Sequence, residues 1–325
     1  MFFGRRELLR RLTQTAGNHV LVGRRQVGKS SLLRAVQREI ARTSNIDCYY
    51  IPLSGPTLDH AVARAVGRDI SFQEVLDDLA QNRKSVFLID EADTFVLQDR
   101  EDGYPRLRLM QHFNDGGYGS FVLAGFWPLY EAAELEESPL RSFEPIHLGP
   151  LDPDACSKLA EDPMDWLNIR YQSNALVRRI IDETGRQPAL ISIVCNELLS
   201  ILKPSSHTIV AADLDTALSS SPVSQTIRLH YEDVESMLIL SMLEENSFTR
   251  SDVEKRSLDL GLDLSAQEID RALAKLEFAG VFQKGEHGYA FGIPLERRLL
   301  LESHPEDRLQ RLLATSRRAT NRRSA

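Results

Sequence analysis

Residues 23–30 constrain the fold of this 325-residue chain more than any other segment, because they form a complete G-x-x-x-x-G-K-[ST] loop. The short apolar run from Asn18 to Val22 precedes the loop, and residues 31–36 continue in helical period. A buried strand, a glycine-rich turn and a helix, in this order, are the context in which the motif binds phosphate. The segment therefore predicts a nucleotide-binding α/β domain.

The residue types in the loop match that chemistry. Gly23 and Gly28 allow the backbone to fold tightly around phosphates, with N–H groups pointing inward at the start of a helix whose dipole favours an anion. Lys29 is expected to reach the β- and γ-phosphates, and the Ser30 hydroxyl to bind Mg²⁺. The predicted nucleotide contacts also include the rest of the loop and the residue after it: Arg24, Arg25, Gln26, Val27 and Ser31.

A second motif, residues 85–93, is an apolar strand that ends in acidic residues. In open α/β sheets ligands bind at the carboxyl ends of the strands, so Asp90 is predicted to bind the Mg²⁺ together with Ser30. Glu91 is predicted to orient and polarise the attacking water, which makes Glu91 and Lys29 the first catalytic candidates. Asp-Glu-Ala-Asp also occurs in helicases, but we find neither a second helicase-like domain nor companion motifs in the chain.

Composition narrows the class of protein. With 42% hydrophobic and 26% charged residues the chain is typical of a globular protein, and neither a stretch of about twenty apolar residues nor a signal peptide is visible. We therefore expect a cytoplasmic protein without a membrane partner. The three cysteines are scattered, so neither a disulfide nor a zinc site is expected. The net charge of -8 argues against non-specific coating of nucleic acid.

Changes in pattern predict four segments. Residues 1–150 alternate between helix and strand, which predicts a parallel sheet of five strands. Breakers near Gly149 and Pro222 bound a small all-helical domain, residues 151–222. Three helices and a hairpin in residues 223–302 match a winged-helix domain, and residues 303–325 form a basic tail that we expect to be flexible.

Two features bear on DNA binding. The exposed face of the third helix of the winged-helix segment is expected to carry a charge-balanced set, which disfavours sequence-specific DNA binding: Gln267, Asp270, Arg271, Ala274 and Lys275. The tail gathers arginines without an acid after Asp307. A solvated terminus is the favoured interpretation of this tail, and an arm that binds nucleic acid or a partner is the alternative.

The opening from Phe2 to Leu8, the loop at 23–30 and the strand ending in Asp90 and Glu91 resemble the STAND branch of the AAA-like P-loop ATPases, archaeal and bacterial proteins with a C-terminal winged helix. The resemblance covers about residues 2–300. It implies a P-loop NTPase sheet followed by a helical lid and a winged helix, with ATP and Mg²⁺ as cofactors. The family uses ATP as a conformational switch, often together with homo-oligomer formation.

The same resemblance assigns roles to further residues. Gly4 and Arg5 would lie near the adenine, Pro188 would contact the nucleotide from the lid, and Arg141 would act as an arginine finger across a subunit interface. A surface arginine without that role is the alternative for Arg141. The chain departs from the family where the fourth strand ends in Ala124 and Gly125 instead of a polar sensor, and where Arg186 replaces a glycine of the lid.

Together these features predict a Mg²⁺-dependent ATPase, slow without a partner, that acts as a nucleotide-controlled switch on a protein partner. One alternative is a DNA-associated ATPase that uses its winged helix and its arginine-rich tail, similar to origin-recognition or transposition ATPases. A second alternative is a module that binds nucleotide and hardly hydrolyses it, because the polar sensor is absent.

Overall fold

The computed structural model describes residues 3–14, 17–43, 45–53, 57–81, 84–203, 206–226, 231, 233–262 and 264–323. Contacts divide the chain into two compact units, Met1–Gly149 and Pro150–Ala325. Within the described ranges, none of the helices combines the length and the apolar composition that crossing a membrane requires.

The first unit is built on the predicted five-stranded parallel sheet. Its strands are β1 (His19–Val22), β2 (Asp47–Pro52), β3 (Ser85–Asp90), β4 (Gly119–Gly125) and β5 (Glu144–His147), in the spatial order β2-β3-β4-β1-β5. The inner strands β1, β3 and β4 are buried almost throughout, which explains their continuous apolar sequences. Because all neighbours are parallel, the carboxyl ends of the strands meet at one edge of the sheet.

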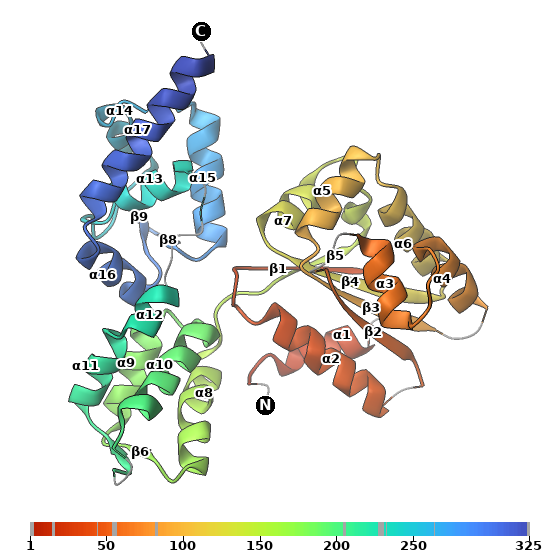
Figure 1. The fold of residues 1–325 in the computed structure, drawn as a ribbon, viewed down its shortest axis with the longest axis horizontal. Helices are drawn as coiled ribbons and strands as arrows, with labels where there is room; N and C mark the ends of the chain where they lie inside the picture. Colours follow the sequence, from red (N-terminus) through yellow and green to blue (C-terminus); the bar gives the residue numbers. More distant parts are fainter. Residues whose placement is uncertain are drawn as a thin grey trace. The chain divides into compact units, whose positions relative to one another are not determined.

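Helices cover both faces of this sheet (Figure 1). One face carries α1 (Arg6–Gln14) and α2 (Lys29–Thr43). The other carries α3 (Leu58–Val66), α4 (Phe72–Ala80), α5 (Asp93–Glu101), α6 (Pro105–Asp115) and α7 (Trp127–Glu134), and a 3-10 helix, η1 (Pro139–Ser142), precedes β5. Phe87, Phe113 and Phe121 pack together in the core, with the Phe87 and Phe121 rings 4.9 Å apart.

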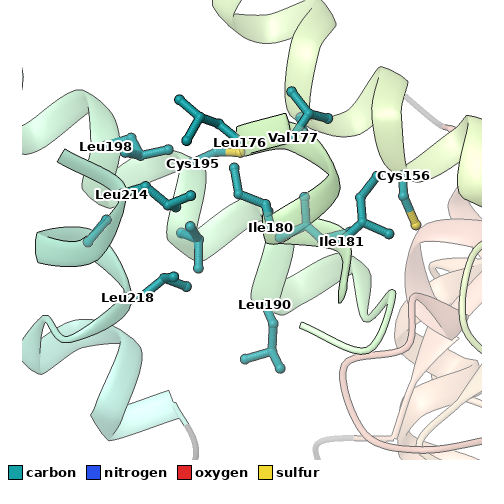
Figure 2. Close-up of a cluster of buried hydrophobic side chains, with 14 of the residues drawn as sticks. Cys156, Leu176, Val177, Ile180, Ile181, Leu190, Cys195, Leu198, Leu214 and Leu218 are labelled. Atoms are coloured by element: carbon teal, nitrogen blue, oxygen red, sulfur yellow. The ribbon is translucent and has the colours of Figure 1, made fainter. Parts of the chain in front are cut away.

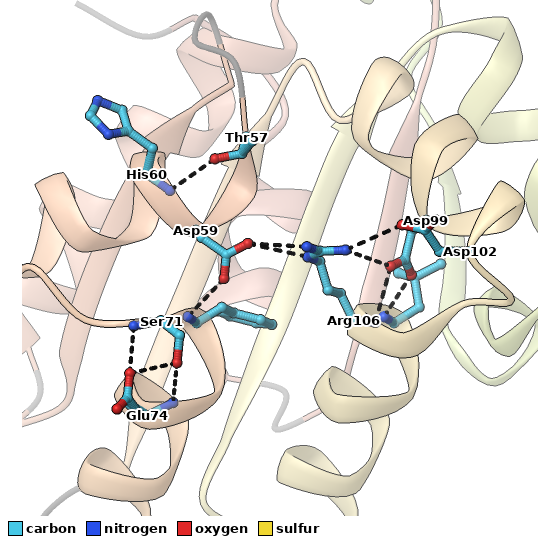
Figure 3. Close-up of polar contacts among 10 residues, drawn as sticks. Thr57, Asp59, His60, Ser71, Glu74, Asp99, Asp102 and Arg106 are labelled. Atoms are coloured by element: carbon cyan, nitrogen blue, oxygen red, sulfur yellow. Dashed lines mark hydrogen bonds and ion pairs between the residues drawn. The ribbon is translucent and has the colours of Figure 1, made fainter.

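A polar network ties four of these helices together (Figure 3). The buried Asp99 carboxylate of α5 accepts from the Arg106 and Leu107 amides, at 3.0 and 2.9 Å, and so caps the first turn of α6. The Arg106 guanidinium donates to Asp59 of α3 at 3.2 and 3.3 Å, and Asp59 accepts from the Phe72 amide at the start of α4. One arginine therefore links the ends of helices that are distant in sequence.

The first half of the second unit is mainly helical. It contains α8 (Pro153–Trp166), α9 (Asn174–Glu183), α10 (Pro188–Ile201), α11 (Ala211–Leu218) and α12 (Ser221–Thr226). Apolar side chains of α9, α10 and α11 meet in one core, in which Ile180, Leu198 and Leu214 are fully buried (Figure 2). A short parallel ladder, β6 (Arg170–Tyr171) with β7 (Thr208–Ile209), departs from the all-helical prediction; each strand has only two residues, too few for a visible alternation.

The rest of the second unit contains three helices and a hairpin in the predicted order. These are α13 (Asp233–Ser241), α14 (Arg250–Asp259) and α15 (Ala266–Phe278), then β8 (Phe282–Gly285) and β9 (Gly288–Phe291), followed by α16 (Pro294–Glu302). The capping box at Ser265 and Glu268 forms at the start of α15, as its sequence predicts.

The structure differs from the flexible tail expected at residues 303–325, because α17 (Pro305–Arg323) is a helix. Leu309, Leu312 and Leu313 lie at helical spacing and pack in a small cluster with Met237 of α13 and Leu262. Leu313 is only 4% exposed. In the sequence the clustered arginines obscure this apolar stripe.

Lys275 is also placed differently from the prediction. Its side chain does not lie on the exposed face of α15: the residue is 8% exposed, and its ammonium pairs with the buried Glu235 carboxylate of α13 at 2.9 Å. The long aliphatic stem allows a lysine to lie along an apolar face when its charge finds a partner. Gln267, Asp270, Arg271 and Ala274 are exposed as expected.

Candidate nucleotide-binding site

The phosphate-binding loop joins β1 to α2 at the carboxyl edge of the sheet. Gly23 is required by packing, because a Cβ there would collide with the Leu148 carbonyl oxygen. Gly28 has φ +99° and Gln26 has φ +63°, so the loop turns through the left-handed region twice. Val27 is buried, which anchors the loop beneath its exposed neighbours Arg25 and Gln26.

Lys29 points back into this loop. Its ammonium donates to the carbonyl oxygens of Gly23 at 2.7 Å and Arg24 at 2.9 Å. Burial lowers the pKa of Lys29 to about 8, and the carboxylates of Asp93 and Asp90 act in the opposite direction. The loop thus holds a cation at its centre, where a phosphate would find both the charge and the backbone amides.

Asp90 ends β3 and is 4% exposed. The Tyr50 hydroxyl donates to its Oδ2 at 2.7 Å, and the Glu91 amide donates to its Oδ1 at 3.1 Å. Tyr50 is a site residue that the sequence did not indicate, because its role depends on β2 lying beside β3. Both carboxylate oxygens are therefore oriented, as a metal ligand requires.

Glu91 follows Asp90 with φ +58°, an unusual conformation for a residue with a side chain. The residue is exposed, directly beyond the carboxyl end of β3. Ser30 and Ser31 occupy the first turn of α2 and are also exposed. The structure therefore leaves these three side chains accessible from solvent.

Asp93 takes a position that the sequence did not reveal. Its carboxylate accepts from the Phe126 amide at 2.9 and 3.0 Å and from the Leu129 amide at 3.1 Å, which caps α7. A Cβ at Gly125 would lie 3.0 Å from Asp93 Oδ1. A polar side chain therefore does reach the end of β4, from the neighbouring strand's loop, although Ala124 and Gly125 supply none.

Arg5 supports the loop from behind. Its guanidinium donates to the Val27 carbonyl and to the Gly149 carbonyl, both at 2.8 Å, and both Gly4 and Arg5 have positive φ. A contact of Gly4 or Arg5 with adenine stays a prediction. Phe2, the first residue of that opening, lies outside the described residues.

The remaining predicted residues lie apart from this cluster in the sequence. Arg141 is exposed on η1, and its guanidinium forms no hydrogen bond or ion pair with any residue that the structure describes. Pro188 is the first residue of α10, and Arg186, with φ +59°, lies just before it in the second unit. The roles of Arg141 and Pro188 stay predictions.

The residues present fit a magnesium–nucleotide complex. Gly23 and Gly28 shape a loop that side chains would block, Lys29 supplies the cation and Asp90 supplies an oriented carboxylate. Arginine, lysine and backbone amides match the phosphates, and hard oxygen ligands match the metal.

Comparison with known proteins agrees with this geometry. Residues 10–130 match the family model described as an AAA domain. The fold is similar to that of a Walker-type ATPase of Pyrococcus abyssi, with 16% sequence identity and a TM-score of 0.71, covering 92% of this chain and 96% of that chain. It is also similar to the Orc1 protein of Aeropyrum pernix, solved in complex with DNA, with 16% identity and a TM-score of 0.50, covering 95% of each chain.

Among curated protein sequences none matches the chain. Because the two structural relatives share so few residues with it, the likeness describes the fold. The chain has the α/β P-loop NTPase fold, and its residues 10–130 are similar to an AAA domain.

Proposed function

We propose that the protein is a Mg²⁺-dependent ATPase of the STAND type that works as a nucleotide-controlled switch for a protein partner and is slow without it. One observation carries the proposal: the Lys29 ammonium lies inside the loop, where the carboxylates of Asp93, Asp90 and Glu91 all act on its charge. In this proposal residues 151–222 form the lid and residues 223–302 the winged helix that respond to the nucleotide.

Each residue has a defined task in this proposal. The amides of residues 23–30 and the Lys29 ammonium hold the phosphates, while the Ser30 hydroxyl and Asp90 hold the metal. Tyr50 keeps Asp90 oriented, and Glu91 accepts a proton from the attacking water. Bound Mg²⁺ and ATP supply the transferable phosphoryl group and the charge that polarises it.

Two substitutions test binding and hydrolysis separately. Lys29→Ala should weaken the binding of a fluorescent ATP analogue by about tenfold to a hundredfold, because a charged hydrogen bond to phosphate is lost. Glu91→Gln should preserve binding and lower phosphate release by about a hundredfold or more, because the general base is lost. The matched control is Lys84→Ala, an exposed lysine at the amino end of the same β3 strand.

The outcomes separate the alternatives. Unchanged nucleotide affinity in Lys29→Ala would contradict the proposed site. Weak binding in Lys29→Ala together with unchanged turnover in Glu91→Gln would instead indicate a nucleotide-binding module with little hydrolysis.

A DNA-associated ATPase is the second candidate, favoured by the arginine-rich α17. Deleting residues 308–325 would be an ambiguous test of this candidate, since it would also remove Leu309, Leu312 and Leu313 from the core. Replacing Arg317, Arg318, Arg322 and Arg323 by Gln keeps those leucines. On this candidate the change should flatten the salt dependence of duplex binding, and on the switch proposal it should not.

A further inference from the structure

Positive charge is concentrated at the start of a chain whose net charge is negative. Residues 1–43 contain ten lysines and arginines and two acidic residues, whereas the whole chain carries a net charge of -8. Seven of these ten basic residues belong to α1 or α2, the two helices that cover one face of the sheet in the first unit (Figure 1).

Arginines form a regular row on this face. Arg34, Arg38 and Arg42 are exposed and follow one another at four-residue spacing along α2, so they lie on one side of the helix over about 12 Å. Arg6 and Arg10 are exposed on α1, which packs against α2. We call these five residues the α1–α2 arginine face.

Two arginines of this row are free to contact a ligand. Neither Arg38 nor Arg42 forms an ion pair or a side-chain hydrogen bond with a residue in the described part of the chain. The acids nearby are few: Glu7 pairs with Arg10, Glu144 pairs with Arg11, and Glu39 is the acidic residue of α2. The charge of the row is therefore not neutralised by the protein's own described side chains.

The face lacks the apolar centre that protein interfaces need. Large apolar side chains that are exposed lie on other elements of the described structure: Leu97, Tyr118, Trp166, Leu167, Ile201, Leu258 and Leu301. Guanidinium groups match phosphate oxygens in a bidentate manner, and a row of them without apolar neighbours matches a repeating phosphate chain.

The third helix of the winged-helix segment is a weaker candidate for the same ligand. With Lys275 buried against Glu235, the exposed charged residues of α15 are Glu268, Asp270 and Glu277 against Arg271. A phosphate backbone would meet net negative charge there.

We propose that the α1–α2 arginine face binds the phosphate backbone of a nucleic acid without reading its bases. The contacts are guanidinium to phosphate, so affinity follows the salt concentration and not the sequence. This proposal goes beyond the ATPase, because the binding requires neither Lys29 nor a nucleotide.

The test uses the full chain without nucleotide and a fluorescein-labelled 30-base-pair duplex, with a single strand of the same length in parallel. Anisotropy titrations at several salt concentrations give the slope of log affinity against log salt. Arg38→Gln with Arg42→Gln should reduce that slope by about one for each arginine. The double variant should also bind two duplexes of unrelated sequence more weakly than the parent does, and to the same extent. Arg64→Gln with Arg108→Gln, two exposed arginines on α3 and α6, should leave the slope unchanged.

Thermal unfolding and nucleotide affinity of each variant show that the fold is intact. Absence of binding by the parent, or an unchanged slope in the Arg38 and Arg42 double variant, would overturn the proposal. The proposal would also be overturned if the control pair reduced the salt slope equally. The same holds if only the variant that lacks the four C-terminal arginines reduced it. If a poly-glutamate peptide competes as well as unlabelled duplex does, the ligand of this face is an acidic protein and not a nucleic acid.

Discussion

At the scale of single residues, the most consequential arrangement is the lysine held by its own loop. Lys29 donates to two carbonyls of residues 23 and 24 and is buried enough to bring its pKa down to about 8. Phosphate would replace the carbonyls as its partner and favour the charged form, which raises the pKa again.

This linkage predicts a pH dependence of nucleotide binding. Below pH 8 Lys29 is protonated in both the free and the bound protein, so affinity should be flat. Above pH 8 the free protein loses the proton and binding must take it up, so affinity should fall as pH rises, by at most about tenfold for each pH unit. Fluorescent-nucleotide titrations at pH 7, 8 and 9, with Lys29→Arg as the permanently charged control, measure this.

An affinity that stays constant from pH 8 to 9 in the parent would argue against a lysine of lowered pKa in the site. The Lys29→Arg variant should show that flat profile whatever its absolute affinity, because arginine keeps its charge throughout this range.

At this scale the sequence was sufficient where a motif is local. The loop, Asp90 and Glu91 could be identified because their neighbours in the sequence define the motif, while their roles stay predictions. Tyr50 and Asp93 were missed because their partners, Asp90 and the Phe126 amide, come from other strands. Tyr50 needs the strand order, and Asp93 needs the contact between two loops, neither of which a single sequence states.

At the scale of elements, Asp99 and Asp102 offer a matched comparison of two acids beside one arginine. The Asp99 side chain is buried and caps α6, whereas the Asp102 side chain is 64% exposed and lies 3.7 Å from Arg106 (Figure 3). Asp99→Ala should lower the free energy of unfolding by about 2 kcal/mol, because two helix amides lose their acceptor. Asp102→Ala should change it by less than about 0.5 kcal/mol. Urea unfolding with an unchanged m-value measures both, and equal effects would contradict the capping role.

The last helix gives a second comparison. Leu313→Ala should destabilise the protein by about 2 kcal/mol or more, because Leu313 fills the cluster with Met237 and Leu262. Leu258→Ala, at a residue that is 68% exposed on α14, should stay within about 0.5 kcal/mol. Differential scanning fluorimetry compares the two variants, and a neutral Leu313→Ala would mean that α17 does not contribute to the core.

Element prediction succeeded where patterns were long and apolar, as for the five strands of the sheet. It failed where two signals competed in one segment. In α17 the arginines masked a leucine stripe, and in α15 the charge of Lys275 masked a position on the buried face. In both helices tertiary packing, and not the polarity of the local sequence, determines which residues are buried.

At the scale of the whole molecule, the arginine-finger role that the family resemblance assigns to Arg141 predicts that full ATPase activity needs more than one copy. Arg141→Ala should keep its nucleotide affinity and lose about a thousandfold in the turnover of the assembled protein, since an arginine finger stabilises the transition state from outside. Light scattering in ADP and in a non-hydrolysable ATP analogue measures assembly. Arg100→Ala, an exposed arginine of α5, is the control.

Mixing two inactive variants tests whether Arg141 acts on the nucleotide site of a neighbouring copy. Lys29→Ala copies retain Arg141, and Arg141→Ala copies retain the intact loop, so a mixture should regain part of the activity that neither has alone. If the mixture assembles but stays as inactive as its components, Arg141 is a surface arginine without a role in hydrolysis.

The position of β1 also has a consequence for the order in which the protein matures during synthesis. This strand leaves the ribosome well before its two neighbours in the sheet, because His19 pairs with Val122 on one side and with Glu144 on the other. The Arg5 guanidinium likewise donates to the carbonyl of Gly149, which is synthesised 144 residues later. Such distant partners delay folding until they have been made. A nascent chain that stops short of Gly149 thus displays the complete loop motif, and we expect it to be unable to hold a nucleotide there.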